Sequence, residues 1–312
     1  MGATERIWSD HPASLRWPLH NLGNEYSAGV GVFSRRDLAR ILELKGHIST
    51  DGYLRFCDGL DEVKYAKRDF LFKSGEWRDA AVERSFPRLM PSNLVLGHSD
   101  IPTKRIIVRL LQFFGVNKLL GTNVAEVPGV SAALPLGLTN DCDDSPRHRI
   151  LGDTQPILMA LSESSSADKA HDNVLLSFNE TTAPKHRSEA VQLLRNQANV
   201  TEIDLDYSVH GRLSYVRAIC GHEFVVCPPG NGVDTHRFWE TLYCGSTPIV
   251  KRGQIIDPLL KQYPAWIVDD WEEVLDPVRR TETRLRLMDH EWDISKLTQS
   301  FWNSFIRNFV ST

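Results

Sequence analysis

Arg237 and Glu240 are the clearest chemical signal in the sequence, because they stand three residues apart on a predicted helix behind a turn of proline and glycine. Free N–H groups and the helix dipole make the first turn of a helix favourable for an anion. A guanidinium there can hold a phosphate through two parallel hydrogen bonds, which lysine cannot reproduce. A carboxylate on the same face suits a pair of sugar hydroxyls. The pattern predicts an anion site with a sugar-binding acid beside it.

The residues before Arg237 predict a strand and a turn. The apolar run 224–227 is typical of a buried parallel strand, and the two prolines after it end the strand because they lack backbone donors. Gly230, Asn231 and Gly232 then tolerate positive φ angles and allow a ligand to approach the backbone.

A short helix should follow the turn. Asp234 or Thr235 is suited to cap a helix over 235–244, and Gly245 is suited to end it before a strand at 247–250. The site would therefore lie at the start of this helix.

A simpler interpretation of the same helix is an exposed ion pair. Arg237 and Glu240 could pair with each other at the surface while Phe238 and Leu242 pack inward. Such pairs are common and contribute little to stability. The turn of proline and glycine favours the anion site.

The motif Pro-x-Gly-x-Gly-x-Asp-Thr-x-Arg-x-x-Glu, followed by Gly-x-x-Pro-Ile-Val, resembles the donor-binding signature of exostosin-like glycosyltransferases. More loosely, it is similar to the donor domain of α-1,3-fucosyltransferases. Both families are inverting, metal-independent enzymes of the GT-B fold, an α/β architecture of two Rossmann-like domains facing a cleft. The resemblance implies a hexosyl- or pentosyltransferase of polysaccharide biosynthesis with a nucleoside diphosphate sugar, of UDP or GDP type, as co-substrate. It implies a glycan or glycoconjugate hydroxyl as acceptor, with no cofactor or metal.

The resemblance also assigns roles to residues. It implies that Arg237 contacts the donor diphosphate, that Glu240 contacts the ribose, and that the turn lies against the nucleotide. Two further segments fit in sequence order, around Ser177 to Arg187 and at Trp271. The implied donor-binding set is Ser177, Thr181, Arg187, Gly230, Asn231, Gly232, Asp234, Thr235, Arg237, Glu240 and Trp271.

Two of these positions also have simpler interpretations. Arg187 stands at a predicted helix start, where anions are favoured, but a solvated basic cluster explains Lys185-His186-Arg187 equally well. Trp271 could lie near the nucleotide or in the core.

Glycosyl transfer also needs a base that takes the proton of the acceptor hydroxyl. Asp100 and His98 follow a predicted strand at 93–97, so both would emerge at its carboxyl end. Asp100 is the first candidate and His98 the alternate. However, Asp100 before Ile101-Pro102 is equally suited to cap the next helix, and His98 could be a core histidine.

Three acidic pairs raise the alternative of a metal-dependent enzyme, because a DxD pair can hold Mn²⁺ or Mg²⁺. They are Asp141/Asp143, Asp204/Asp206 and Asp269/Asp270. The arginine-bearing turn would compensate the diphosphate charge without a metal, so we expect none.

Composition limits the function class. The chain has 312 residues, a hydrophobic fraction of 41% and a net charge of −4, which indicates a folded protein with no global field for nucleic acid or anionic membranes. Its five cysteines lack metal-binding spacing and predict reduced thiols. No signal peptide or transmembrane segment is predicted, so we expect a bacterial or viral cytoplasmic protein unless an anchor was trimmed from it.

The predicted elements divide the chain into an acceptor-side domain at 1–155, a donor domain at 170–290 and a terminal amphipathic helix at 291–312, with a hinge within 140–170. The donor domain alternates strands and helices, as in a parallel sheet. Its strands are predicted at 173–178, 224–227, 247–250 and 265–269, and its helices at 186–198, 207–219, 235–244, 257–262 and 271–287.

The acceptor side is less regular. Its predicted helices are 35–46 and 102–115, and its strands are 69–73, 93–97, 117–121 and 130–136. The terminal helix carries Leu297, Phe301, Phe305 and Phe309 at spacings of four. The GT-B resemblance implies that it crosses back to the first domain, and packing on its own domain is the alternative.

Two other function classes remain open. A glycosyltransferase-like subunit that binds a nucleotide or glycan without catalysis would carry the same donor motif. A Rossmann dehydrogenase is disfavoured because no G-x-G-x-x-G follows an early strand.

Overall fold

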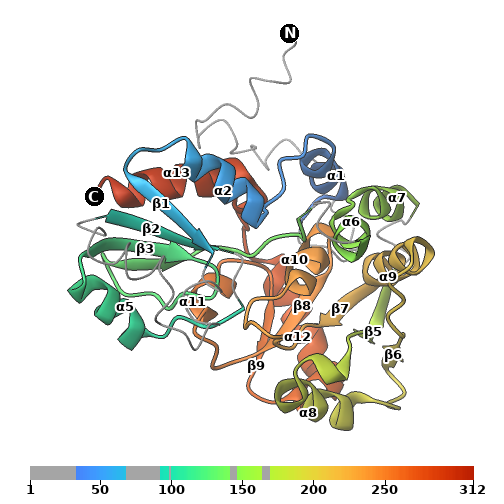
Figure 1. Ribbon diagram of the computed structural model, residues 1–312. Helices are drawn as coiled ribbons and strands as arrows, with labels where there is room; N and C mark the ends of the chain where they lie inside the picture. Colours follow the sequence, from blue (N-terminus) through green and yellow to red (C-terminus); the bar gives the residue numbers. More distant parts are fainter. Residues whose placement is uncertain (1–32, 68–91, 98–99, 141–145, 164–168) are drawn as a thin grey trace.

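The structure is a computed structural model that describes residues 33–67, 92–97, 100–140, 146–163 and 169–312. It is an α/β fold with two parallel sheets (Figure 1), which confirms the α/β part of the predicted fold class. The N-terminal half, up to residue 140, contains a four-stranded sheet in the order β1-β2-β3-β4. Its strands are β1 (Val63–Lys67), β2 (Ser92–Gly97), β3 (Val116–Gly121) and β4 (Ser131–Ala133).

The C-terminal half, from residue 169, contains a five-stranded sheet in the order β6-β5-β7-β8-β9. Because the chain goes from β5 out to β6 and then back past β5 to β7, the direction of strand addition reverses between β5 and β7. Ligands of parallel sheets bind in the crevice at the carboxyl ends of strands at such a point. The strands are β5 (Ala170–Leu176), β6 (Val200–Glu202), β7 (His222–Val226), β8 (Thr247–Lys251) and β9 (Trp266–Val268).

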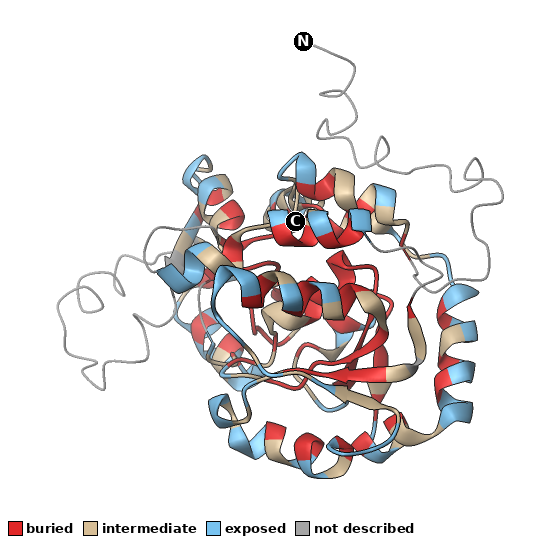
Figure 2. Ribbon diagram, turned by 90° about the vertical axis from the view of Figure 1, so that its right-hand side faces the viewer, coloured by how far each residue is buried: buried red, intermediate tan, exposed pale blue. Residues whose placement is uncertain are grey.

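Helices cover both faces of the five-stranded sheet (Figure 1), which explains the apolar runs in its central strands. Val174, Phe224 and Ile249 pack toward one face, while Leu175 and Val225 pack toward the other. Figure 2 shows this buried interior in red. The helical elements after β5 are η5 (Glu180–Thr182), α8 (Pro184–Leu194), α9 (Val209–Gly221), α10 (His236–Tyr243), α11 (Asp257–Leu260), η6 (Trp271–Leu275) and α12 (Pro277–Met288).

The segment in which the hinge was predicted contains two helices that were not predicted, α6 (Pro146–Gly152) and α7 (Gln155–Glu163). Ile157, Ala160 and Leu161 of α7 are buried, at the spacing of one helix face. They pack α7 against α9 and α1 (Arg35–Glu43). The polar residues at both ends of the segment had hidden this periodicity.

The terminal helix crosses back to the N-terminal half, as the resemblance implied. After η7 (Ile294–Leu297), α13 (Gln299–Val310) packs against α2 (Thr50–Asp58) and β3. Gln299 N donates to Gly46 O at 2.9 Å. The buried residues of α13 are Trp302 and Ile306. The buried face of this helix is therefore displaced by one residue from Phe301, Phe305 and Phe309, which are half-buried.

Several predicted boundaries shift. The helix α5 (Arg105–Phe113) begins later than predicted, and the predicted helix 271–287 is split into η6 and α12 at Pro277. The predicted strand 69–73 lies outside the described residues, while β1 and the edge strand β6 were not predicted. In the described ranges, no helix is both long and apolar enough to cross a bilayer. Four cysteines there are buried free thiols, and Cys142 lies outside these ranges.

Candidate functional site

A cavity that is open to solvent lies at the carboxyl end of the five-stranded sheet. Its walls come from the loop after β5, the segment that leads into α9, and the turn between β7 and α10. Asp100, Leu136 and Thr139 of the N-terminal half also line it. The cavity therefore lies between the two halves, at the point where the strand order reverses.

The turn after β7 follows the predicted path for a different reason. The strand ends at Val226, and the backbone turns back where Gly230 N donates to Gly232 O at 2.9 Å. Neither glycine has a positive φ, contrary to the expectation from sequence. Instead, they leave space: a Cβ on Gly230 would lie 3.0 Å from Arg187 Nη2, and one on Gly232 would lie 2.8 Å from Asn123 Nδ2.

Asp234 connects the turn to the N-terminal half by hydrogen bonds. Its carboxylate accepts hydrogen bonds from Leu136 N and from Trp239 Nε1, both at 2.8 Å, and its own N–H donates to Asn123 Oδ1 at 2.8 Å. Burial raises the pKa of Asp234 to about 7, although these N–H groups favour the carboxylate. Thr235 is the N-cap residue of α10 but makes no side-chain cap bond.

Arg187 and Arg237 bring two guanidinium groups to the cavity. Both lie over the ring of Phe178, at 5.5 and 5.6 Å from its centroid. Arg187 donates to two carbonyl oxygens, Asn179 O at 2.6 Å and Pro229 O at 3.0 Å. Burial and the charge of Arg237 lower the pKa of Arg187 to about 10.

Arg187 and Arg237 lack an ion-pair partner in the described part of the chain, although Tyr215 and Glu240 favour the charged form of Arg237. Within the described ranges, Arg237 Nε is buried without a hydrogen-bond partner. Uncompensated buried charge is costly unless a ligand offsets it. The basic cluster at 185–187 is therefore not simply solvated, because Arg187 itself is buried.

Glu240 is buried and paired with Arg212, not with Arg237 as an exposed ion pair on α10 would require. Its Oε1 accepts from Arg212 Nη1 at 2.6 Å, and its Oε2 accepts from Tyr215 OH at 3.0 Å. Both partners lie on α9. The exposed Arg237–Glu240 pair is therefore excluded, and Glu240 lines the cavity as a fixed carboxylate.

Asp100 and His236 face the cavity from opposite halves. Asp100 is exposed, and its backbone lies against Gly232. It does not cap the next helix, because the N-cap of α5 is Lys104. His236, the first residue of α10, is half-buried, and its Nδ1 lies 2.8 Å from Gly137 O. The alternate base, His98, lies outside the described residues.

The structure brings most of the predicted donor set together, but it places three residues away from the cavity. Ser177 Oγ and Trp271 Nε1 are buried and have no hydrogen-bond partner among the described residues, and the Trp271 ring packs in the core, as its alternative interpretation allowed. Thr181 bonds to Asn179 Oδ1 through its N–H and hydroxyl, so it stabilises the local turn.

Three carboxylates of the acidic pairs have structural partners. Asp206 accepts from the N–H and the hydroxyl of Ser208, Asp269 pairs with Arg252, and Asp270 caps η6. Asp141 and Asp143 lie outside the described residues. In the described part of the chain, no group of three or more His, Cys, Asp or Glu side chains is arranged to hold a metal ion.

Four residues of this site were not predicted from sequence: Asn123, Arg212, Tyr215 and His236. Arg212 and Tyr215 are three residues apart and share a helix face, a spacing visible in the sequence. His236 stands next to Arg237 within the motif itself. Asn123 gave no signal, because its contact with Asp234 spans 111 residues.

No protein-family model matches the chain, and no curated protein does.

Proposed function

We propose that this chain is an inverting, metal-independent glycosyltransferase. It would move a sugar from a nucleoside diphosphate donor, of UDP or GDP type, to a hydroxyl of a glycan or glycoconjugate. The five-stranded half would hold the donor and the four-stranded half the acceptor, in a GT-B arrangement. The exostosin-like motif supports this proposal together with the location of the cavity.

One observation carries the proposal: Arg187 and Arg237 present two guanidinium groups to the cavity without a carboxylate partner among the described residues. A diphosphate offers the negative charge and the oxygen geometry that two guanidinium groups recognise. The start of α10 lies beside them and favours the same ligand.

The proposed reaction assigns a role to each group. The acceptor oxygen forms a bond to the anomeric carbon on the face opposite the diphosphate. The bond from that carbon to the diphosphate oxygen breaks, and its electron pair leaves with the nucleoside diphosphate. Arg187 and Arg237 stabilise the negative charge that develops. The hydroxyl proton passes to a base in the cleft, for which the sequence proposed Asp100.

A thermal-shift panel of UDP, GDP, ADP, CMP and their sugars tests the proposal, because a ligand that binds only the folded state raises the melting temperature. We expect UDP or GDP to stabilise the protein. Arg237→Ala should weaken that binding roughly 10- to 100-fold, the range expected for a lost charge-assisted hydrogen bond. Arg252→Ala is the matched control, because Arg252 follows a strand of the same sheet but is paired with Asp269.

Turnover then separates the enzyme from the catalytically inert binding subunit. Release of nucleoside diphosphate in the presence of glycan acceptors, persisting in EDTA, is the expected result. Full and reversible loss in EDTA would exclude the metal-independent mechanism. Binding without any release would favour the inert subunit, and the absence of nucleotide binding would exclude both.

A further inference from the structure

The hydrogen bond of His236 fixes which of its ring nitrogens can act on a ligand. Nδ1 lies 2.8 Å from Gly137 O, and a carbonyl oxygen only accepts hydrogen bonds. Nδ1 must therefore carry a proton, and in the neutral ring the lone pair lies on Nε2. Within the described ranges, no residue forms a hydrogen bond with Nε2, and this atom is not among the buried polar atoms that lack a partner.

The carbonyl that holds His236 is itself held in place. Gly137 has a φ of +73°, and a Cβ there would lie 2.1 Å from Ile48 O. The next residue, Leu138, donates its N–H to the same Ile48 oxygen at 2.9 Å. The imidazole therefore comes from the C-terminal half but is oriented by a rigid segment of the N-terminal half.

The ring lines the cavity immediately before Arg237, so it lies close to the place where the donor would react. Asp100 approaches from the N-terminal half, and its negative charge acts on the imidazole. The geometry points to His236, rather than Asp100 or His98, as the base that takes the proton from the acceptor hydroxyl. This inference rests on the proposed glycosyltransferase function.

In this step, Nε2 accepts the hydroxyl proton while the acceptor oxygen bonds to the anomeric carbon, and the donor's carbon–oxygen bond breaks toward the diphosphate. The imidazolium that forms keeps its Nδ1–H bond to Gly137. Asp100 is then a positioning residue that stabilises the imidazolium by its charge. At the end of this step the proton is on His236, and the electron pair of the broken bond is on the nucleoside diphosphate.

The charged groups around His236 determine its protonation. Burial lowers its pKa, and Arg212 lowers it too, whereas the bond to Gly137, Glu240 and Asp100 raise it. The net shift is downward, so the ring is neutral and able to accept a proton at neutral pH. Activity should therefore rise as pH rises through a pKa below the usual histidine value of about 6.5.

His236→Asn is the decisive variant, because the amide of asparagine can still donate to Gly137 O but offers no nitrogen at Nε2. We expect a loss of at least about 100-fold in kcat, the usual contribution of a general base. The affinity for UDP or GDP should stay within threefold. The assay is release of nucleoside diphosphate from UDP-glucose, UDP-N-acetylglucosamine, UDP-glucuronate, GDP-mannose and GDP-fucose with methyl glycoside acceptors, from pH 5 to 9.

The chain offers a matched control at the other end of β7. His222 Nδ1 lies 2.7 Å from Ala218 O, so it makes the same kind of bond outside the cavity. His222→Asn should leave kcat and its pH profile unchanged. Asp100→Asn should keep the acidic limb of the profile but move it to lower pH, because the Asp100 carboxylate raises the pKa of His236.

Turnover by His236→Asn within threefold of the unmutated chain would overturn the inference, as would loss of the acidic limb in Asp100→Asn alone. Long-range ¹H–¹⁵N spectra, assigned by comparison with His236→Asn, add a readout independent of turnover. They should show the proton on Nδ1 at pH 7.5, and a proton on Nε2 would overturn the inference. Failure of the proposed function would look different, since the unmutated chain itself would then bind and cleave no donor.

Discussion

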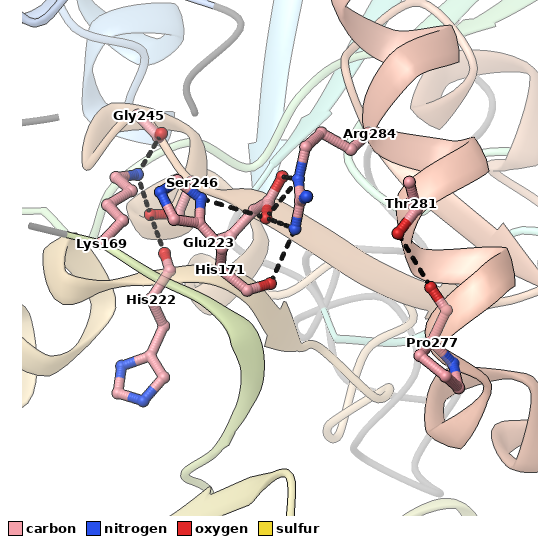
Figure 3. A network of polar contacts seen from close by, with 9 residues as sticks. All are labelled: Lys169, His171, His222, Glu223, Gly245, Ser246, Pro277, Thr281 and Arg284. Carbon is pink, nitrogen blue, oxygen red and sulfur yellow. Dashed lines mark hydrogen bonds and ion pairs between the residues drawn. The ribbon is translucent and has the colours of Figure 1, made fainter. Parts of the chain in front are cut away.

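The two ends of the five-stranded sheet both carry buried charges, and they compensate them differently. At the amino end, Glu223 accepts two hydrogen bonds from Arg284 Nε, at 2.7 and 2.8 Å, and Arg284 Nη2 also donates to His171 O. Lys169 donates to Gly245 O and to Ser246 Oγ (Figure 3). Glu223 and Arg284 thus neutralise each other, while Lys169 is held by two uncharged oxygens.

At the carboxyl end, Arg212 is paired with Glu240, but Arg187 and Arg237 have no carboxylate partner among the described residues. Helix α10 connects the two ends. Its C-terminus meets Lys169, which offsets the negative end of the dipole, while its N-terminus faces the cavity. Under the proposed function, the amino end serves stability, whereas the carboxyl end keeps positive charge available for the anionic donor.

The largest expected effect is on stability at the amino end. Glu223→Ala would leave Arg284 without its carboxylate in a largely buried position, and breaking such a pair costs about 3–5 kcal/mol. Urea denaturation should show this loss, while the affinity of the remaining folded protein for UDP or GDP stays unchanged. A stable Glu223→Ala protein with weakened nucleotide binding would invalidate the division of roles.

The second-largest effect is expected at the carboxyl end, where a substitution should weaken nucleotide binding and leave stability almost unchanged. Arg237→Met should reduce nucleotide affinity by about 2–3 kcal/mol, because a charge-assisted contact is lost. Its free energy of unfolding should change by less than about 1 kcal/mol, since Arg237 is half-buried and forms no ion pair with a described residue. Calorimetric titration and urea denaturation measure the two quantities, and a large loss of stability would show that Arg237 is structural.

A smaller effect depends on pH. Burial lowers the pKa of Lys169 to about 8, below that of the unfolded chain. Between these two values the unfolded chain binds more protons, so this residue makes the free energy of unfolding rise as pH rises from about 8 to 10. Relative to Lys169→Met, which lacks this group, the gain should be roughly 1–3 kcal/mol. Parallel plots of the free energy of unfolding against pH for the two proteins would contradict this prediction.

The smallest effect is expected at an exposed pair that joins α8 to the end of β8. Glu189 pairs with Lys251 at 2.6 Å, but its side chain is 46% exposed. Glu189→Ala should therefore change the free energy of unfolding by at most about 1 kcal/mol and leave nucleotide affinity unchanged. Urea denaturation of this variant beside Glu223→Ala shows whether burial, rather than the ion pair alone, sets the stability of the amino end.

The sequence predicted those parts of the fold that depend on local pattern. The apolar runs gave β5, β7, β8 and β9, and Gly245, with a φ of +66°, ends α10 as expected. The edge strand β6 escaped prediction because it is three residues long and half-exposed. Local pattern thus identifies the buried strands and misses the edge.

The candidate site likewise has features that local sequence predicts and others that depend on long-range packing. Arg187, Arg237 and the turn could be placed from the motif, because helix starts and proline-glycine turns are local features. The pairing of Glu240 with Arg212 could not, since these residues are 28 positions apart and meet only when α9 and α10 pack together. Even the two glycines of the turn are explained by long-range approach, to Arg187 and Asn123, rather than by their own dihedral angles.

The crossing of α13 has a counterpart at the other end of the described chain. While α13 rests on β3 and α2, α1 packs on α7, and Arg35 Nη2 donates to Cys220 O of the C-terminal half. Each half is thus completed by a helix encoded near the opposite end. During translation, α13, which completes the four-stranded half, would emerge from the ribosome only after the whole five-stranded half. Polypeptides ending or starting near residue 165 would each lack a helix, so they should fold well only when mixed.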